Sequence, residues 1–304
     1  RKRKQPPPKQ KSLNNPLRIV NERNILMAIS MQDIKELREL TGAGLMEVKK
    51  ALEEANGDKE AAVKAIRLAG KKSLAKREDR STANGLVMAK VLDTADGQAG
   101  VMVELNSETD FVGKSPKFVE AAEEIMQALV DSGVSTREEL LAAKCGEGTV
   151  KEKVEEIGAL FSENIVLGKV TRIEGEAVTS YLHYSSADLP AQVGVLVSTD
   201  KAGADVAHDI ALHIAAYDPR FIDREEVPQA ELDKERETLR EMTLKEGKPE
   251  KIVDKIVEGR MGSFYKDNCL LDQDFAKDPK KSVGQIVKAS GGKVTAFARF
   301  HVGS

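Results

Sequence analysis

Residues 85–106 read GLVMAKVLDTADGQAGVMVELN, and this stretch decides the fold class. Two strands are predicted, over 85–94 and 99–106, because apolar residues alternate along the second run at Val101, Val103 and Leu105. Asp96-Gly97 between the two runs is a hairpin signal. A helical stripe follows at Phe118, Ala122, Ile125 and Leu129. The segment therefore predicts an antiparallel hairpin with a helix laid over it.

The same pattern returns further along the chain. Residues 177–184 and 192–199 predict two more strands, followed by a helical stripe at Val206, Ile210, Ile214 and Tyr217. Gly194-Val195-Leu196-Val197 aligns with Gly100-Val101-Met102-Val103. We therefore expect a duplicated α+β unit, in which a helix covers one face of each small antiparallel sheet. A last strand over 293–303 is expected to join one of the sheets.

Helical segments are predicted on either side of this core. Residues 30–70 contain three short apolar stripes and predict a small three-helix bundle, broken at Thr41-Gly42-Ala43-Gly44 and at Asn56-Gly57. The stripes are Ile34, Leu37 and Leu40, then Leu45, Val48, Leu52 and Ala55, then Ala62, Val63 and Ile66. Two helices are expected within 135–163, and a later antiparallel pair of helices turns at Glu246-Gly247-Lys248-Pro249.

These elements predict an order of domains. It runs from a disordered basic extension (1–29) through a three-helix domain (30–70), a linker (71–84), an N-terminal core subdomain with a helical insert (85–165), a C-terminal core subdomain (166–225) and a coiled-coil hairpin (226–266) to a return segment with the last core strand (267–304).

Charge and composition exclude several classes of protein. The chain has a net charge of −3, but residues 1–30 carry eight bases and one acid, which leaves −10 on the rest. An acidic body argues against nucleic acid as its partner. No apolar run of about 18 residues occurs, so a membrane span is not expected. Two cysteines far apart, Cys145 and Cys269, give neither a disulfide scaffold nor a cysteine zinc site, and a cytoplasmic protein is expected.

The basic arm at 1–26 is rich in proline and poor in apolar residues, so we expect it to be disordered. It lacks the apolar centre of a secretory signal. Arg1–Lys4 could contact phosphates or act as a nuclear address. The favoured interpretation is a solvated tail, or sequence upstream of a start at Met27 or Met31.

The sequence contains no recognisable enzyme site. His183, His208, His213 and His301 match no metal or catalytic motif, and solvated or internally bonded histidines are the favoured interpretation. Gly70-Lys71-Lys72-Ser73 resembles a phosphate-binding loop only in part, because it lacks the earlier glycine and the Gly-Lys-Ser/Thr ending.

The loop Ser107-Glu108-Thr109-Asp110-Phe111-Val112-Gly113 is the most unusual stretch, because an aromatic residue stands among polar ones at the end of a strand. From the residues alone, the favoured interpretation is that Phe111 packs under the sheet and Asp110 caps a turn. The alternative is an aromatic and carboxylate wedge that is offered to a partner, since binding energy concentrates in such anchors.

Two stretches resemble the signatures of the bacterial elongation factor Ts family. Thr41-Gly42-Ala43-Gly44-Leu45-Met46 with Lys49-Lys50-Ala51-Leu52 is similar to TGAGMMDCKKAL, and Leu105-Asn106-Ser107-Glu108-Thr109-Asp110-Phe111-Val112 is similar to LNCETDFVA. Shorter matches are Ser180-Tyr181-Leu182-His183, Gly247-Lys248-Pro249-Glu250 and Val257-Glu258-Gly259-Arg260. Together they span about residues 31–303 in the order of the family.

The resemblance implies a guanine-nucleotide exchange factor for elongation factor Tu, which is not an enzyme and uses no cofactor, metal or small-molecule substrate. It implies a ubiquitin-associated-like (UBA-like) three-helix domain, a duplicated core and a coiled-coil hairpin. The resemblance places beside the magnesium site of elongation factor Tu the residues Thr109, Asp110, Phe111 and Val112. It implies that the nucleotide-binding domain of elongation factor Tu is contacted by Arg38, Leu45, Met46 and Lys49. It also implies that the core contacts the partner through His183.

The chain departs from the family pattern at a few positions. Ser107 replaces Cys and Glu47-Val48 replaces Asp-Cys, and we expect neither change to touch the wedge. Gly113 replaces Ala, which is expected to loosen the helix start. Phe161-Ser162-Glu163-Asn164 stands where an Ile-Gly-Glu-Asn run is common, a departure that bears on contact with the partner. Two other functions stay open: a binding module for ubiquitin-like or helical partners, and an RNA-associated translation protein that uses the basic arm.

Overall fold

The computed structural model describes residues 29–41, 43–73, 77 and 79–304. The expectations for the basic arm and for Gly42 lie outside the described residues. The chain divides into two compact units, Arg1–Ser73 with Ala159–Ser162, and Leu74–Gly158 with Glu163–Ser304, and each is described by itself. No helix among those described has the length and apolar character needed to cross a membrane.

The first unit contains three helices around one core, as the stripes in the sequence predict. They are α2 (Met31–Thr41), α3 (Leu45–Glu54) and α4 (Lys59–Ser73). Ser30 and Asp33 cap α2 reciprocally, because each backbone N–H donates to the other side chain, at 3.1 and 3.0 Å. The buried core consists of Ile34, Leu37, Ala43, Val48, Ala51, Leu52, Ala62 and Ile66.

Two predicted core positions of this unit are wrong. Leu40 is 43% exposed and Leu45 is 44% exposed. At 100° per residue, Leu40 is turned well away from the Ile34 side of α2, and Thr41 takes the inward place. Burial of Thr41 is possible because its hydroxyl donates to the Leu37 carbonyl at 2.6 Å. Leu45 is the first residue of α3, beyond the end of the core.

Gly70 has a structural role rather than a role in phosphate binding. Helix α4 continues through this residue to Ser73. A Cβ atom on Gly70 would lie 2.0 Å from the backbone oxygen of Ala159, which belongs to the same unit. Glycine is therefore required here for the close approach of two backbones.

The second unit contains two three-stranded antiparallel sheets, which confirms the α+β class. The first has the order β1 (Asn84–Thr94), β2 (Gly97–Ser107), β5 (Val166–Gly175), and the second has the order β10 (Val294–His301), β7 (Val193–Thr199), β6 (Ala177–His183). The last strand joins a sheet as expected. Strand β5 was not predicted. It lies in the range assigned to the C-terminal core subdomain but pairs with β2.

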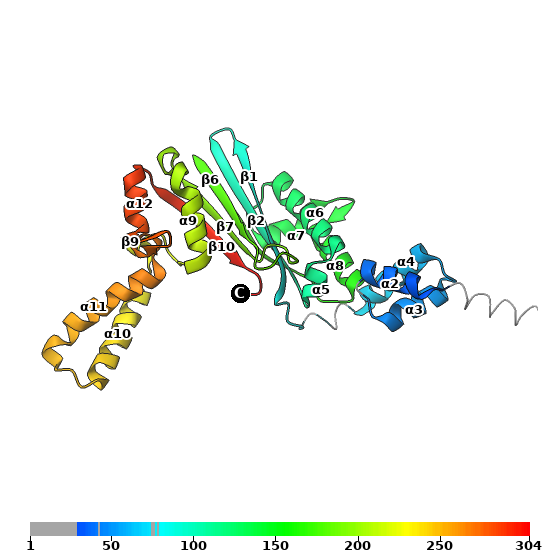
Figure 1. Ribbon diagram of the computed structural model, residues 1–304, viewed down its shortest axis with the longest axis horizontal. Coiled ribbons are helices and arrows are strands. Elements are labelled where there is room, and N and C mark those ends of the chain that lie inside the picture. The colour runs from blue at the N-terminus through cyan, green and yellow to red at the C-terminus, as the bar shows by residue number, and fades with distance from the viewer. Residues whose placement is uncertain (1–28, 42, 74–76, 78) are drawn as a thin grey trace, which may run out of the picture. The chain divides into compact units, whose positions relative to one another are not determined.

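Each sheet carries a helix on its outer face, as predicted. Helix α6 (Pro116–Ser132) covers the first sheet and α9 (Ala204–Tyr217) covers the second (Figure 1). The sequence did not predict that the two inner faces also pack together, around the buried residues Val87, Met102, Leu196, Phe300 and Val302. The central strands β2 and β7 are consequently buried on both faces.

The duplicated glycines allow this contact between the sheets. A Cβ on Gly194 would lie 2.5 Å from Val87 Cγ1 and 2.7 Å from Met102 Sδ. A Cβ on Gly100 would lie 3.0 Å from Leu196 Cδ2. Since Gly100 aligns with Gly194 and Met102 with Leu196, the two halves pack against each other in equivalent ways, which supports the duplication inferred from sequence.

The remaining elements connect and extend the core. Two helices occur within 135–163, as predicted: α7 (Arg137–Ala142) and α8 (Val150–Phe161), with the short strands β3 (Lys144–Cys145) and β4 (Gly148–Thr149) between them. Helices α10 (Gln229–Lys245) and α11 (Glu250–Asn268) pack together, and ion pairs such as Arg236–Glu258, at 3.3 Å, link them. Short elements complete the unit: η2 (Lys201–Gly203), η3 (Arg224–Glu226), η4 (Leu270–Asp272), β8 (Asp274–Phe275), β9 (Asp278–Ser282) and α12 (Val283–Ser290).

Candidate functional site

The loop after β2 forms a single helical turn that exposes an aromatic ring. Helix α5 (Asp110–Gly113) begins at the cap residue Thr109, whose hydroxyl accepts from the Val112 backbone N–H at 3.4 Å. Val112 is buried, whereas Phe111 is 74% exposed. The interpretation favoured from the residues alone, with Phe111 under the sheet and Asp110 as the cap, is therefore wrong. One turn of helix directs neighbouring side chains about 100° apart, and Val112 takes the inward direction.

A lysine completes the exposed tip. Lys114 Nζ lies 4.7 Å from the centre of the Phe111 ring and 3.5 Å from a carboxylate oxygen of Asp110. An exposed ion pair of this kind contributes about 0.2–1 kcal/mol, and an exposed cation–π contact about 0.5–1 kcal/mol. Both contacts are weak enough to be exchanged for contacts with a partner.

The base of the loop is held by a reciprocal pair of glutamates. The Thr109 backbone N–H and hydroxyl both donate to Glu163, at 3.1 and 2.6 Å. In return, the backbone N–H of Asn164 donates to Glu108 at 2.6 Å. Burial raises the pKa of Glu163 above its usual value of 4.5, although the bonds from Thr109 oppose this change. We call this arrangement of Glu108, Thr109, Glu163 and Asn164 the carboxylate clasp.

Further hydrogen bonds fix the loop to the end of the sheet. The Asn84 side chain donates to the Glu108 carbonyl at 2.8 Å, and the Ser107 hydroxyl donates to the Thr109 carbonyl at 2.9 Å. The expectation that the change at Ser107 does not touch the wedge is therefore wrong, because a hydroxyl donor contacts the loop directly. Gly113 ends α5, and a Cβ there would make an ordinary contact, 3.4 Å from the Gly85 nitrogen.

The comparisons with known proteins agree on one family. The family model described as "Elongation factor TS" matches residues 108–304. Elongation factor Ts of Beutenbergia cavernae is 53% identical over 274 residues, which cover 90% of this chain and 98% of that protein. The protein of the same name from Arthrobacter sp. (strain FB24) is 52% identical over 275 residues, with 90% and 98% coverage. That of Bifidobacterium longum subsp. infantis is 49% identical over 278 residues, with 91% and 98% coverage.

The chain belongs to the elongation factor Ts family. This membership assigns it to the factors of translation elongation in protein biosynthesis. The exposed tip of the loop thus contains the last four residues of the second family signature, Thr109-Asp110-Phe111-Val112.

The four site residues predicted in the first unit are all exposed. Arg38 lies in the last turn of α2, and Leu45 and Met46 begin α3, where Met46 is 70% exposed. Lys49 lies one turn further along α3 and forms an ion pair with Glu53 at 3.8 Å. Two apolar and two basic side chains are therefore available to a partner on this unit.

His183, which was predicted to contact the partner from the core subdomains, lies exposed at the end of β6. Its Nδ1 atom is 3.0 Å from the hydroxyl of Tyr181, and the ring of Tyr181 lies edge-on to His208 at 6.0 Å. If the tyrosine hydroxyl donates, the Nε2 atom of His183 carries the proton and is presented to solvent. His213, in contrast, is buried and bonds Gln273 at 2.9 Å, which agrees with the interpretation of an internally bonded histidine.

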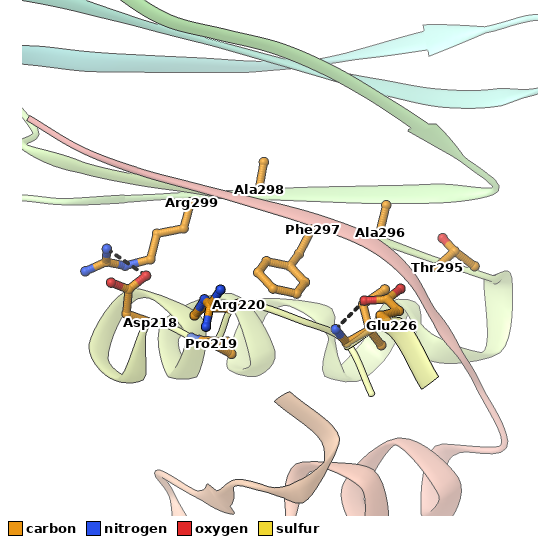
Figure 2. A pocket seen from close by; sticks show the side chains of 10 residues that line it. Asp218, Pro219, Arg220, Glu226, Thr295, Ala296, Phe297, Ala298 and Arg299 are labelled. Atoms are coloured by element: carbon orange, nitrogen blue, oxygen red, sulfur yellow. Dashed lines mark hydrogen bonds and ion pairs between the residues drawn. The ribbon is translucent and has the colours of Figure 1, made fainter. Parts of the chain in front are cut away.

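A cavity of about 510 Å³ lies between β10 and the segment that follows α9 (Figure 2). Two of its charged side chains pair with each other, Arg299 with Asp218 at 3.0 Å, and Arg220 pairs with Glu231 of α10. Phe297 projects from β10 into the same space (Figure 2). The first pair holds the segment against the sheet and the second holds it against α10, so we assign the cavity no part in the site. Over the described ranges, no group of three or more His, Cys, Asp or Glu side chains is placed to hold a metal ion.

The hydrogen bonds that shape the site were not predicted from the sequence, although Glu163 and Asn164 belong to the run compared with the family pattern. Glu163 and Asn164 are more than fifty positions from the loop that they bind, and a strand pairing brings them there. Lys114 and Tyr181 lie close in sequence to predicted site residues, and spacing on one turn of helix or on one strand face could have found them.

Proposed function

We propose that the chain binds elongation factor Tu with GDP and promotes GDP release. In this proposal the Thr109-Asp110-Phe111-Val112 loop enters beside the magnesium and phosphate site of that partner, after which GTP rebinds. The observation that carries the proposal is the 74% exposure of Phe111 on a turn whose base is fixed by hydrogen bonds. Apart from its weak contact with Lys114, a large aromatic ring held in solvent contributes little to the stability of the isolated fold, and such rings are typical anchors of interfaces.

The physical basis of exchange is linkage between two binding sites. If the factor weakens GDP binding a thousandfold, GDP weakens binding of the factor by the same ratio, a coupling of about 4 kcal/mol. Full burial of a phenylalanine side chain contributes about 1.5–3 kcal/mol. Since most of Phe111 is exposed, its burial can supply about half of the coupling. Competition by Asp110 for groups around the magnesium ion would supply part of the rest.

The first unit gives the partner a second surface in this proposal. Arg38, Leu45, Met46 and Lys49 would contact its nucleotide-binding domain. We propose that α2, α3 and α4 form a UBA-like domain, and their common core of short helices supports this assignment. A contact remote from the nucleotide would hold the factor in place while the loop competes with phosphate and magnesium.

The other domain assignments are also proposals. We infer that α10 and α11 form a coiled-coil hairpin, supported by their buried seam of Val253, Val257 and Met261 and by the ion pairs between them. His183 would add a polar contact from the core. The chain would act in the cytoplasm, where elongation takes place.

Release of fluorescent GDP from elongation factor Tu tests this proposal. At a subsaturating concentration, Phe111→Ala is expected to slow stimulated release about thirtyfold, which corresponds to about 2 kcal/mol. Asp110→Ala is expected to slow release by a smaller factor, because Asp110 is already paired with Lys114. Ile252→Ala, at another exposed apolar residue that is 44% exposed on α11, should match the wild type. Equal rates for wild type and Phe111→Ala would refute the role of the loop.

A further inference from the structure

The carboxylate clasp has the geometry of a rigid mount for the exposed ring. We propose that Glu163 and Glu108 are positioning residues, which hold the turn at Thr109 fixed so that Phe111 is presented in one orientation before the partner arrives. This inference rests on the proposed exchange function for its consequence, but its structural part concerns the free protein alone.

The first support is reciprocity. Residues 108 and 109 face residues 163 and 164, and each pair supplies one carboxylate and one backbone N–H to the other. Two crossed bonds between the same pairs restrict both sliding and rotation, which a single bond would allow. Arg80 binds the Glu108 carboxylate at 3.2 and 3.3 Å, and the Asn164 side chain donates to the Arg80 carbonyl at 3.0 Å. Arg80 therefore bonds to both halves of the clasp, to Glu108 on one segment and to Asn164 on the other.

The second support is the need for a carboxylate. Glu163 accepts the N–H of Thr109 on one oxygen and the hydroxyl of Thr109 on the other. A glutamine of the same shape has a single acceptor oxygen and would turn its NH₂ group toward one of these donors. The same Thr109 hydroxyl accepts the Val112 N–H and so begins α5. The orientation of the turn that carries Phe111 thus depends on the two acceptor oxygens of Glu163.

The third support is that the arrangement places a carboxylate where burial is unfavourable for its charged form. Burial disfavours the charged form of Glu163, and the neighbouring Glu108 adds to this effect. Two neighbouring carboxylates repel each other, and like-charge pairs of this kind are often found at functional sites. What the clasp provides is preorganisation, because a ring that is already ordered loses less conformational freedom when it binds.

The absence of tryptophan from the sequence permits a test in the free protein. The chain has no Trp, so Phe111→Trp introduces a single fluorescent reporter at the tip of the loop. We expect the steady-state anisotropy of this indole to fall when Glu163→Gln is added, and to stay unchanged when Glu147→Gln, at an exposed acid in the turn between β3 and β4, is added instead. Thr109→Val, which removes the donor from the other side of the clasp, should reproduce the fall. Because the Thr109 hydroxyl also caps α5, Glu163→Gln is the deciding variant, and unchanged anisotropy in it would overturn the proposal whether or not the chain has exchange activity.

A double-mutant cycle then separates positioning from general loosening of the fold. With an otherwise wild-type loop, Glu163→Gln is expected to slow stimulated GDP release about tenfold, the scale set by ordering one or two groups on binding. In a Phe111→Ala background the same change should slow release less than twofold, since the group that it positions is gone. Equal factors in both backgrounds would overturn the assignment. If the wild-type chain does not stimulate release, the proposed function fails, while the anisotropy result still decides whether the clasp orders the loop.

Discussion

Replacing Gly194 with alanine tests the way in which the two sheets of the second unit pack. The added Cβ would lie 2.5 Å from Val87 Cγ1 and 2.7 Å from Met102 Sδ, both on the facing sheet. Carbon atoms in contact prefer about 3.5–4.0 Å, so the neighbours must move by about 1 Å. Met102 can rotate away, but Val87 is β-branched and lies within β1, where its side chain has little freedom.

The magnitude follows from two opposing contributions. Overpacking of a core costs about 1–3 kcal/mol, and removing the freedom of glycine in the unfolded chain returns about 0.4–1 kcal/mol. Gly194→Ala should therefore lower the free energy of unfolding by about 1–2 kcal/mol. For a unit of this size, each kcal/mol shifts the melting temperature by about 2–4 °C, so a fall of roughly 4 °C is expected.

Calorimetry of the wild type and four variants gives the measurement: Gly194→Ala, Gly259→Ala, Val87→Ala and the double variant of Val87 and Gly194. Gly259→Ala is the matched control, because Gly259 lies within α11 and a Cβ there meets no atom within 4 Å. Its melting temperature should rise, since alanine stabilises a helix interior by about 0.5–1 kcal/mol relative to glycine. Val87→Ala should destabilise the Gly194→Ala protein less than the wild type, because it relieves the clash. A melting temperature for Gly194→Ala that rises as it does for Gly259→Ala would refute the packing of the sheets.

Three further predictions concern single contacts. Ser162 has a φ of 58°, in the left-handed region that favours glycine, so Ser162→Gly should raise the free energy of unfolding by about 0.5–1 kcal/mol in urea titrations; a lower midpoint would contradict this. Burial lowers the pKa of His213 below 6.5, although its bond with Gln273 opposes this change. The contribution of His213 to the free energy of unfolding should thus be constant above about pH 6.5 and should fall below it by up to about 1.4 kcal/mol per pH unit. If the His213→Gln variant loses stability with the same slope, this histidine is not the cause. Tyr181→Phe removes the hydroxyl that is 3.0 Å from His183, and should raise the concentration of factor for half-maximal exchange about fivefold; an unchanged value would mean that this bond does not matter for partner binding.

Local patterns in the sequence predict the elements well where one face is buried and the other is not. The strands at 85–94 and 99–106 appear as β1 and β2, and the aligned glycines at 100 and 194 take equivalent places. Strand β5 was missed because it lies at the edge of its sheet and is mostly half-buried, which leaves little alternation to read. The inner contact of the sheets was missed because periodicity shows which residues are buried, but not what covers them.

The candidate site shows the same division. The family signature identified the stretch from Thr109 to Val112, but the residues alone favoured a buried Phe111, since a large apolar side chain next to a sheet is usually buried. One turn of helix decides that Val112 points inward and Phe111 outward. The clasp depends on Glu163, which is brought to the loop by the chain path between β2 and β5. No local pattern in either segment indicates that pairing.

The proposed exchange function is tested most directly by the rate of GDP release from elongation factor Tu at substoichiometric amounts of the wild-type chain. Elongation factor Tu loaded with fluorescent GDP is mixed with excess unlabelled GDP, and the decay of fluorescence is followed with and without the factor. An exchange factor is released after each turnover, so one molecule of this chain should discharge many molecules of partner, at a rate proportional to its concentration. Release that proceeds at the spontaneous rate at every concentration of the chain would contradict the proposed exchange function.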